Sequence, residues 1–355
     1  MKFGIIGASF ARKAYLPALA HVDGAEVVAI SSGRIDSARS AAEAFGIPHV
    51  HDDWEDMLGS HALDAVLIAT PTDLHAPMVL RAIESGAHVL CEKPMAMDAV
   101  EAQTMLRAAE TARRLHMIDH ELRFNPNHMR IAELIGDGSL GDIRHVNIAN
   151  IGSAWSDPAG RSAGDWWSLD QRGGGRLGAN GSHQVDLLRW WLGPVKSVSG
   201  QVATCVADRT DPETGTPWTA TADDLTRFSL ETTGGVLADV FISAVAATNM
   251  GNITQIFGSR GTIELGEGGD RLRLSRDGGA FEDISVADPA ATLPGVNGGI
   301  WNVSVVSALR EFAAAAREGR ALRRGATFHD GLANQRVLDA VRLSSRDRRW
   351  IDLDP

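Results

Sequence analysis

The chain has few of the features that mark secreted, membrane or nucleic-acid-binding proteins. Its two cysteines, Cys91 and Cys205, cannot form a disulfide framework, and there is no C-x-x-C pair, so a reducing cytoplasm is the expected compartment. No apolar run approaches the roughly 18 residues of a membrane span, and we see no charged leader with a cleavage site. The net charge of −11 argues against a nucleic-acid partner.

Lysine is scarce as well, and one lysine stands at an informative position. The 34 basic residues include only four lysines, at positions 2, 13, 93 and 196. The segment HVLCEKP (residues 88–94) begins like a buried strand, and Lys93 precedes Pro94, which cannot continue a sheet ladder. Ligands bind beyond the carboxyl ends of strands in open α/β sheets. Lys93 is therefore expected to face a ligand and trade a proton, unless it is a solvated charge that caps the strand.

Length and hydrophobic patterning predict two domains. The 355 residues, 44% of them hydrophobic, suffice for two cores. In residues 1–120, short apolar runs alternate with helical patterns, which predicts an α/β fold with a doubly wound parallel sheet of the Rossmann type. Farther along, between residues 195 and 285, strand follows strand, which predicts a large, mostly antiparallel open sheet in an α+β domain. We assign this second domain to residues 121–355, with closing helices within 300–345.

The turn after the first strand suggests a dinucleotide cofactor. Gly7 begins the small-residue segment GASFA, and a helical pattern follows, so the backbone could approach a pyrophosphate there. Ser9 stands where a second glycine is expected, which leaves a plain βα turn as the alternative. We expect cofactor contacts from this segment at Gly7, Ser9, Phe10 and Ala11. The second strand ends without an acid, and Ser32 and Arg34 favour NADP over NAD, although Arg34 could simply be solvated.

Five spaced segments carry a family resemblance. They are GIIGASFARKAYLPAL, DAVLIATPTDLHAPMVLRAIESGAHVLCEKPMA, HELRFNPNHMRIAELI, GGGRLGANGSHQVDLLRWWLG and TFHDGLANQRVLDAVRLSSR. In this order they resemble the glucose–fructose oxidoreductase and inositol dehydrogenase family, Gfo/Idh/MocA. The resemblance implies that Lys93 is catalytic beside the nicotinamide and the substrate hydroxyl, and that Glu92 lies near the cofactor ribose. It also implies a cofactor groove lined by Thr70, Pro71, Thr72 and His75.

Two departures from the family pattern affect the predicted site. The glycine turn is shorter than usual and carries Ser9. In the second half, Ala179 stands where family dehydrogenases often have an aspartate, with Asn180 next to it, so the usual Lys-Asp-His trio is incomplete. The resemblance still implies that His183 transfers the substrate proton, and Asp186, on the same helical face, could orient it or bind substrate. A purely structural helical histidine is the alternative.

Further substrate contacts are expected from polar and aromatic side chains. Glu121 and Arg123 are two apart, so in an extended segment they share a face and could bind sugar hydroxyls; an interdomain salt bridge is the alternative. Trp166 lies in a loop-rich stretch, where it could stack on a sugar ring or pack at an interface. Asn180 completes the predicted substrate contacts, and no metal ligands are expected.

Together these residues predict an NAD(P)-dependent oxidoreductase. A hydride would pass between the nicotinamide and a secondary alcohol or ketone of a sugar, cyclic polyol or sugar derivative, with His183 as general base and Lys93 polarising the oxygen. Two alternatives stay open: redox-neutral, NAD-dependent elimination or glycosidic cleavage, and a non-catalytic dinucleotide and sugar sensor. Because one face of the C-terminal sheet needs cover, we also expect a homodimer or homotetramer.

Overall fold

The computed structural model describes residues 1–353, apart from the side chains of residues 267 and 300. Packing divides the chain into two compact units, one made of residues 1–125 and 288–333 and the other of residues 126–287 and 334 onward. The domain boundary predicted from the sequence lies at one point only, after residue 120. Residues 288–333 join the first unit because helix α9 (Ile300–Glu318) contributes Leu309 and Phe312 to the core that contains Tyr15 and Leu16.

The first unit is built on a six-stranded parallel sheet. Its strands are β1 (Lys2–Ile6), β2 (Glu26–Ser31), β3 (His49–His51), β4 (Ala65–Ile68), β5 (His88–Cys91) and β6 (His116–Ile118). Their order is β3-β2-β1-β4-β5-β6, which confirms the predicted Rossmann sheet and puts the topological switch point between β1 and β4. All four residues of β4 are buried, as expected for a strand covered on both faces.

Helices cover both faces of this sheet. They are α1 (Ala8–Lys13), α2 (Tyr15–Leu19), α3 (Ile35–Phe45), α4 (Trp54–Ser60), α5 (His75–Glu84), α6 (Ala99–Thr111) and α9. The single helix predicted after Gly7 is instead two short helices that meet at Ala14, whose φ of −125° is not helical. Pro17 accounts for the break, because in a continuous helix its ring would collide with the carbonyl of residue 13, whereas it fits the first turn of α2.

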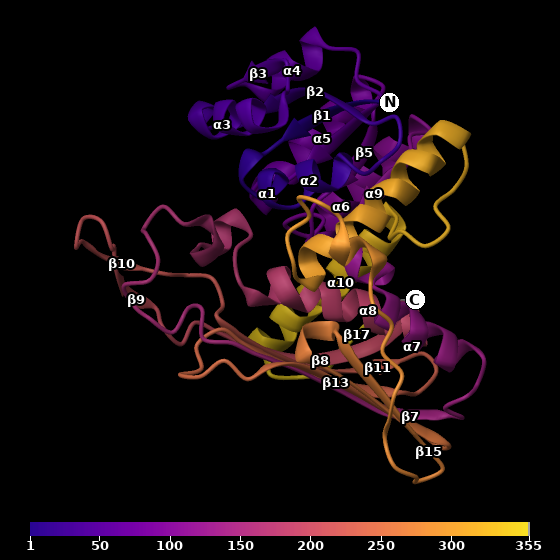
Figure 1. The fold of residues 1–355 in the computed structure, drawn as a ribbon. Helices are drawn as coiled ribbons and strands as arrows, with labels where there is room; N and C mark the ends of the chain where they lie inside the picture. Colours follow the sequence, from indigo (N-terminus) through magenta and orange to yellow (C-terminus); the bar gives the residue numbers. More distant parts are fainter. Residues whose placement is uncertain (354–355) are drawn as a thin grey trace. The chain divides into compact units, whose positions relative to one another are not determined.

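The second unit is built on a nine-stranded sheet in the order β16-β15-β14-β13-β7-β12-β11-β8-β17 (Figure 1). The strands are β7 (Ile143–Ile151), β8 (Val195–Ala203), β11 (Leu225–Thr232), β12 (Leu237–Ser243), β13 (Gly251–Gly258), β14 (Gly261–Gly266), β15 (Arg271–Arg276), β16 (Glu282–Asp283) and β17 (Ile351–Asp352). Only β12 and β7 pair in parallel, so the prediction of a mostly antiparallel sheet is confirmed. Strand β8 ends at Ala203, and β9 (Asp208–Thr210) and β10 (Pro217–Thr219) form a separate hairpin.

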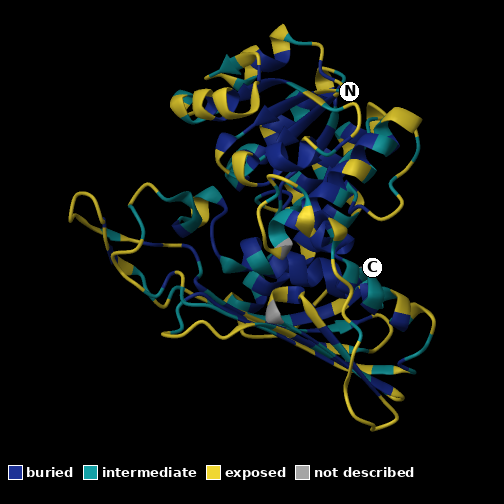
Figure 2. Ribbon diagram, in the orientation of Figure 1, coloured by how far each residue is buried: buried dark blue, intermediate teal, exposed yellow. Residues whose placement is uncertain are grey.

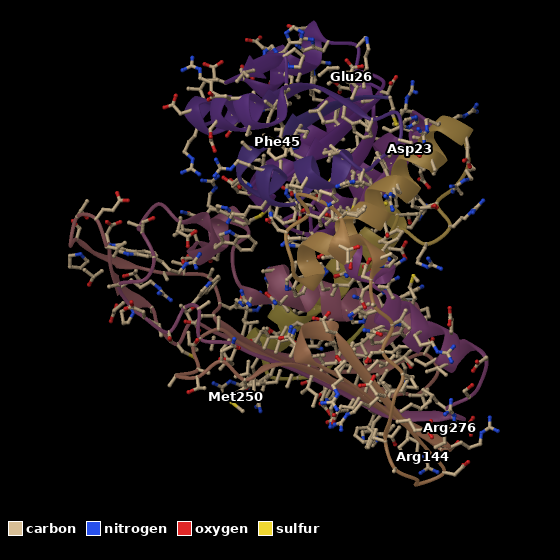
Figure 3. All side chains as sticks on the ribbon, in the orientation of Figure 1. Asp23, Glu26, Phe45, Arg144, Met250 and Arg276 are labelled. Carbon is tan, nitrogen blue, oxygen red and sulfur yellow. The ribbon has the colours of Figure 1, made fainter. Side chains whose placement is uncertain are left out.

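One face of the nine-stranded sheet is covered by α7 (Pro126–Gly136) and α8 (Ser182–Leu192) (Figure 1). Buried and exposed residues are interspersed along its strands (Figure 2), and they alternate in β12. The other face exposes Leu237, Phe241 and Ile253. Met250, labelled in Figure 3 on the turn before β13, is 73% exposed. The last helix, α10 (Phe328–Asp347), contains the division between the units. Within the described residues, no helix combines the length and apolarity needed to cross a bilayer.

Candidate active site

Gly7 shapes the turn between β1 and α1 at the switch point. Its φ of +102° favours glycine, and a Cβ at this position would collide with the carbonyl oxygen of Ala69 at the end of β4. The N–H of Gly7 donates to the carbonyl of Ser31 at 2.8 Å, which ties the turn to β2 as well. The turn is therefore a close-packed backbone cradle of the kind that suits a pyrophosphate.

Arg34 brings together the polar residues predicted to bind the adenosine side of a cofactor. Its Nη2 lies 3.4 Å from the hydroxyl of Ser9, and its backbone N–H lies 3.3 Å from the hydroxyl of Ser32. A cation and two hydroxyls fit an anionic group on a ribose. Phe10 and Ala11, also predicted as cofactor contacts, pack inward: Phe10 meets the Tyr15 ring edge-to-face at 5.2 Å, and Ala11 is fully buried in the core.

His75 connects the loops that follow β4 and β5. Its Nε2 lies 3.0 Å from the carbonyl oxygen of Thr70, and its Nδ1 lies 3.0 Å from that of Pro94. Burial lowers the pKa of His75, so the ring is neutral at neutral pH and its single N–H serves one of the two carbonyls. Thr72 is buried and Pro71 half-buried in the short helical turn that precedes His75. The imidazole thus holds this loop against the segment that carries Lys93.

Lys93 belongs to a buried cluster of charged side chains at the carboxyl ends of β5 and β6. Its Nζ lies 3.5 Å from Oε2 of Glu92, and the hydroxyl of Tyr15 donates to Oε1 of Glu92 at 2.7 Å. Because Cys91 pairs with Ile118, the residues after β6 lie beside Glu92 and Lys93. Two more acids, Asp119 and Glu121, are there 1% and 2% exposed. One ammonium group, on a side chain that is 13% exposed, therefore lies among three buried carboxyl groups.

The electrostatics of this cluster keep Lys93 protonated. Burial by itself lowers the pKa of Lys93, but the charges of Glu92, Glu121 and Asp119 outweigh it, so the pKa lies above its ordinary value. Burial and the repulsion between carboxylates raise the pKa of Asp119 and Glu121 well above the ordinary range. The cluster is thus suited to hold a proton among its acids and to present a cationic hydrogen-bond donor at Lys93.

Two members of the cluster were missed by sequence reasoning. Tyr15 is the only tyrosine of the chain, and its hydroxyl reaches an acid 77 positions away. Asp119 follows an apolar strand directly, as Glu92 does, and that shared position was the available signal.

Arg123 forms an ion pair within the first unit. Its Nη2 lies 3.1 Å from Oδ1 of Asp330, and Nη1 lies 3.5 Å from the carbonyl oxygen of Arg324. Of the two interpretations offered by the sequence, the pair favours a salt bridge, although both partners belong to one unit rather than to two domains.

The second unit carries the other predicted site residues. His183 and Asp186 are both 1% exposed on α8, three residues apart and hence on one face. A π-helical turn over Leu177–Gly181 precedes α8 and contains Ala179 and Asn180; such turns occur frequently at functional sites. Trp166 stacks on Trp167 with ring centroids 4.1 Å apart, so part of its surface is already used for packing.

The strand order and the Gly7 turn define a Rossmann fold of the dinucleotide-binding kind, and comparison with known families identifies it as that of an oxidoreductase. Residues 1–120 match the model described as the oxidoreductase family with an NAD-binding Rossmann fold. Residues 128–264 match the GFO/IDH/MocA C-terminal domain. The chain belongs to the Gfo/Idh/MocA family of oxidoreductases, which confirms the family expected from its sequence.

Individual relatives extend over nearly the whole chain. A scyllo-inositol 2-dehydrogenase (NADP(+)) of Bacillus subtilis is 26% identical over 100% of this chain and 96% of its own length. A levoglucosan dehydrogenase of Pseudarthrobacter phenanthrenivorans is 25% identical over 91% of this chain and 88% of its own. The crystal structure of an oxidoreductase domain protein from Kribbella flavida superposes with a TM-score of 0.88 at 28% identity, covering 99% of both chains.

Proposed function

We propose that the protein is an NAD(P)-dependent dehydrogenase that interconverts a secondary alcohol and a ketone on a sugar or polyol. The observation that carries this proposal is Lys93, 13% exposed, whose ammonium group is accompanied by three buried carboxyl groups at the ligand-facing edge of an NAD-binding sheet. Relatives named for scyllo-inositol and levoglucosan support a polyhydroxylated substrate.

Each side chain has a defined task in the proposed reaction. Bound NAD(P)⁺ supplies the hydride acceptor. Lys93 donates a hydrogen bond to the substrate oxygen and stabilises the negative charge that develops there. Because the pKa of Lys93 is raised by Glu92 and its neighbours, against the effect of burial, Lys93 is a poor base, and the hydroxyl proton goes to His183 as general base. Glu121, Asn180, Asp186 and Trp166 are assigned to the remaining substrate contacts.

The proposed cofactor contacts favour NADP. Gly7 allows the backbone to approach a pyrophosphate, and Arg34 with Ser9 and Ser32 offers a cation and hydroxyls to a ribose phosphate. An NAD site of this fold instead places an acid at the end of the second strand, where this chain has serines.

The test is absorbance at 340 nm with NADP⁺ or NAD⁺ and a panel of aldoses, inositols and sugar acids. A rise that Lys93→Met abolishes supports the dehydrogenase and identifies the cofactor. Turnover within a few fold of wild type in that variant contradicts the role of Lys93, and an unchanged pH profile in His183→Ala contradicts His183 as the base. Because Ala179 leaves the Lys-Asp-His trio incomplete, product analysis should also look for redox-neutral cleavage, in which no reduced cofactor accumulates.

We further propose that copies of the chain associate through the uncovered face of the nine-stranded sheet. Phe241 and Ile253 flank Ala149 in neighbouring strands, and Leu237 is 52% exposed on β12. Exposed large hydrophobic residues gathered on one face are typical of an interface. Light scattering after size exclusion should give a dimer or tetramer, and Phe241→Asp should shift it towards the monomer. A wild-type monomer at micromolar concentration would refute this proposal.

A further inference from the structure

An indole in the second unit has two guanidinium groups over it. The Cζ atoms of Arg161 and Arg176 lie 4.4 and 5.2 Å from the ring centroid of Trp155, which is itself buried. Burial and, to a smaller extent, the charge of Arg161 lower the pKa of Arg176 to about 10, whereas Asp223 acts in the opposite direction. Arg176 remains a cation at neutral pH, with Arg161 as a like-charged neighbour and Asp223 as an acid that compensates part of the charge.

The neighbouring arginines already have acceptors for part of their donors, although Nε of Arg209, like that of Arg176, is buried without a partner among the described residues. Arg161 forms an ion pair with Asp165 and also donates to the Ser168 hydroxyl at 3.1 Å. Arg209 donates to the backbone carbonyls of Trp155 and Asp157 at 3.1 and 3.2 Å. Asp165 thus compensates the positive charge of Arg161, and two carbonyls accept hydrogen bonds from Arg209.

Arg176 is different. Within residues 1–353, its guanidinium makes no hydrogen bond or ion pair, and its Nε is buried. Asp223, whose charge raises the pKa of Arg176, accepts the backbone N–H of Leu177 at 2.8 Å, and burial raises the pKa of Asp223 to about 6. The side chain is half-buried, but its Nε is out of water without an acceptor, which is costly, and a bound anion would remove that cost.

The position of Arg176 in the chain points to the substrate. It directly precedes the π-helical turn Leu177–Gly181, which leads into the helix of His183. Ala179 in this turn carries no charge, so the turn itself does not repel an anionic group. A planar guanidinium fork stacked on an aromatic ring suits a carboxylate, which it can bind with two parallel hydrogen bonds.

We propose that Arg176, oriented by Trp155, is a carboxylate subsite, and that the preferred substrate is therefore a sugar acid such as an aldonate or uronate rather than a neutral polyol. This inference rests on the proposed dehydrogenase function, whose substrate class it narrows.

The experiment compares matched substrates that differ only in the carboxylate, D-glucuronate with D-glucose and D-galacturonate with D-galactose. The wild type should favour the acidic member of at least one pair by tenfold or more in kcat/KM. Arg176→Gln should lower kcat/KM for that acid by 30-fold or more, mainly through KM, and change the neutral member by less than threefold. Arg176→Lys should recover part of the loss, because the charge returns without the fork.

Arg144→Gln is the matched control, since Arg144 is an exposed arginine of the same unit, labelled in Figure 3. It should change neither substrate. Equal losses on acid and neutral substrates in Arg176→Gln, with a lowered melting temperature, would show a structural arginine and overturn the proposal. So would a wild type without preference for the acids.

Calorimetry separates this inference from the proposed function. If no sugar gives a signal that depends on Lys93, D-glucuronate is titrated into the protein with NADP⁺ or NAD⁺ present. Binding that Arg176→Gln lacks and Arg144→Gln keeps would support the carboxylate subsite although the dehydrogenase proposal had failed. Absence of binding, or binding unchanged by Arg176→Gln, would overturn the subsite.

Discussion

Replacing Tyr15 by phenylalanine removes one buried hydroxyl from the first unit and leaves the ring that packs against Phe10. The hydroxyl donates to Glu92 at 2.7 Å, and both side chains are buried. Burial and the charges of Asp119 and Glu92 raise the pKa of Tyr15 well above its ordinary value, so it is a neutral donor at neutral pH. The variant therefore withdraws one hydrogen bond from a buried carboxylate.

The expected cost follows from the kind of hydrogen bond that is lost. A hydrogen bond to a charged group contributes about 1.5–3 kcal/mol, and phenylalanine keeps the ring volume, so there is little cavity cost to add. We expect Tyr15→Phe to lower the free energy of unfolding of the first unit by about 2 kcal/mol. Its kcat/KM in the Lys93-dependent assay should also fall, because Glu92 lies 3.5 Å from Nζ of Lys93.

Urea unfolding of a double-mutant cycle isolates the contact. The cycle compares wild type, Tyr15→Phe, Glu92→Gln and the double variant, and the coupling between the two positions should be at least about 1 kcal/mol. A loss below about 0.5 kcal/mol in Tyr15→Phe, with coupling near zero, would refute the view that this hydroxyl stabilises the buried carboxylate.

Three further predictions concern the cofactor turn, the cofactor and pH. Gly7→Ala should lower the melting temperature and weaken nucleotide binding in calorimetry, since its φ of +102° and the Ala69 carbonyl exclude a Cβ; unchanged values would contradict the cradle. Arg34→Gln should weaken NADP⁺ binding about tenfold while NAD⁺ changes little, and equal effects would remove its phosphate role. Burial lowers the pKa of His128 to about 3, so as the pH falls this histidine is protonated in the unfolded chain before it is protonated in the folded protein. The free energy of unfolding therefore falls as the pH drops below about 6.5. Between pH 7 and 5 the wild type should lose about 2 kcal/mol more than His128→Phe in urea unfolding, and parallel losses would exclude this histidine.

The sheet of the first unit could be predicted because its strands carry their own signal. The segment AVLI of β4 is apolar throughout, as a strand covered on both faces must be. Strand β3, His49–His51, was missed because HVH has no apolar run, and it becomes a strand by pairing with β2. The β9–β10 hairpin was missed for a related reason, since these short polar strands are defined by their pairing with each other.

The candidate site was predictable where position along a strand carried the information. Glu92 and Lys93 follow an apolar run directly, and the sequence places them at the ligand edge. Tyr15 and Asp119 belong to the Lys93 cluster because of which strands are neighbours and which side chains are buried. Neither property can be predicted from the adjacent residues in the sequence. Arg176 could not be singled out from the sequence, where it is one more arginine after a glycine run. Its stacking on Trp155 and its lack of an acceptor are visible only in the folded chain.

Residues 288–333 complete the core of the first unit, although they are synthesised long after residues 1–125. The core beside Tyr15 and Leu16 includes Leu309 and Phe312 of α9, so this apolar surface has no native cover while the first 125 residues leave the ribosome. At translation rates of about 5–20 residues per second, α9 follows about 10–40 seconds later. During that interval we expect the nascent first unit to expose this apolar surface and to depend on chaperones, and a message truncated before α9 should yield an aggregating product.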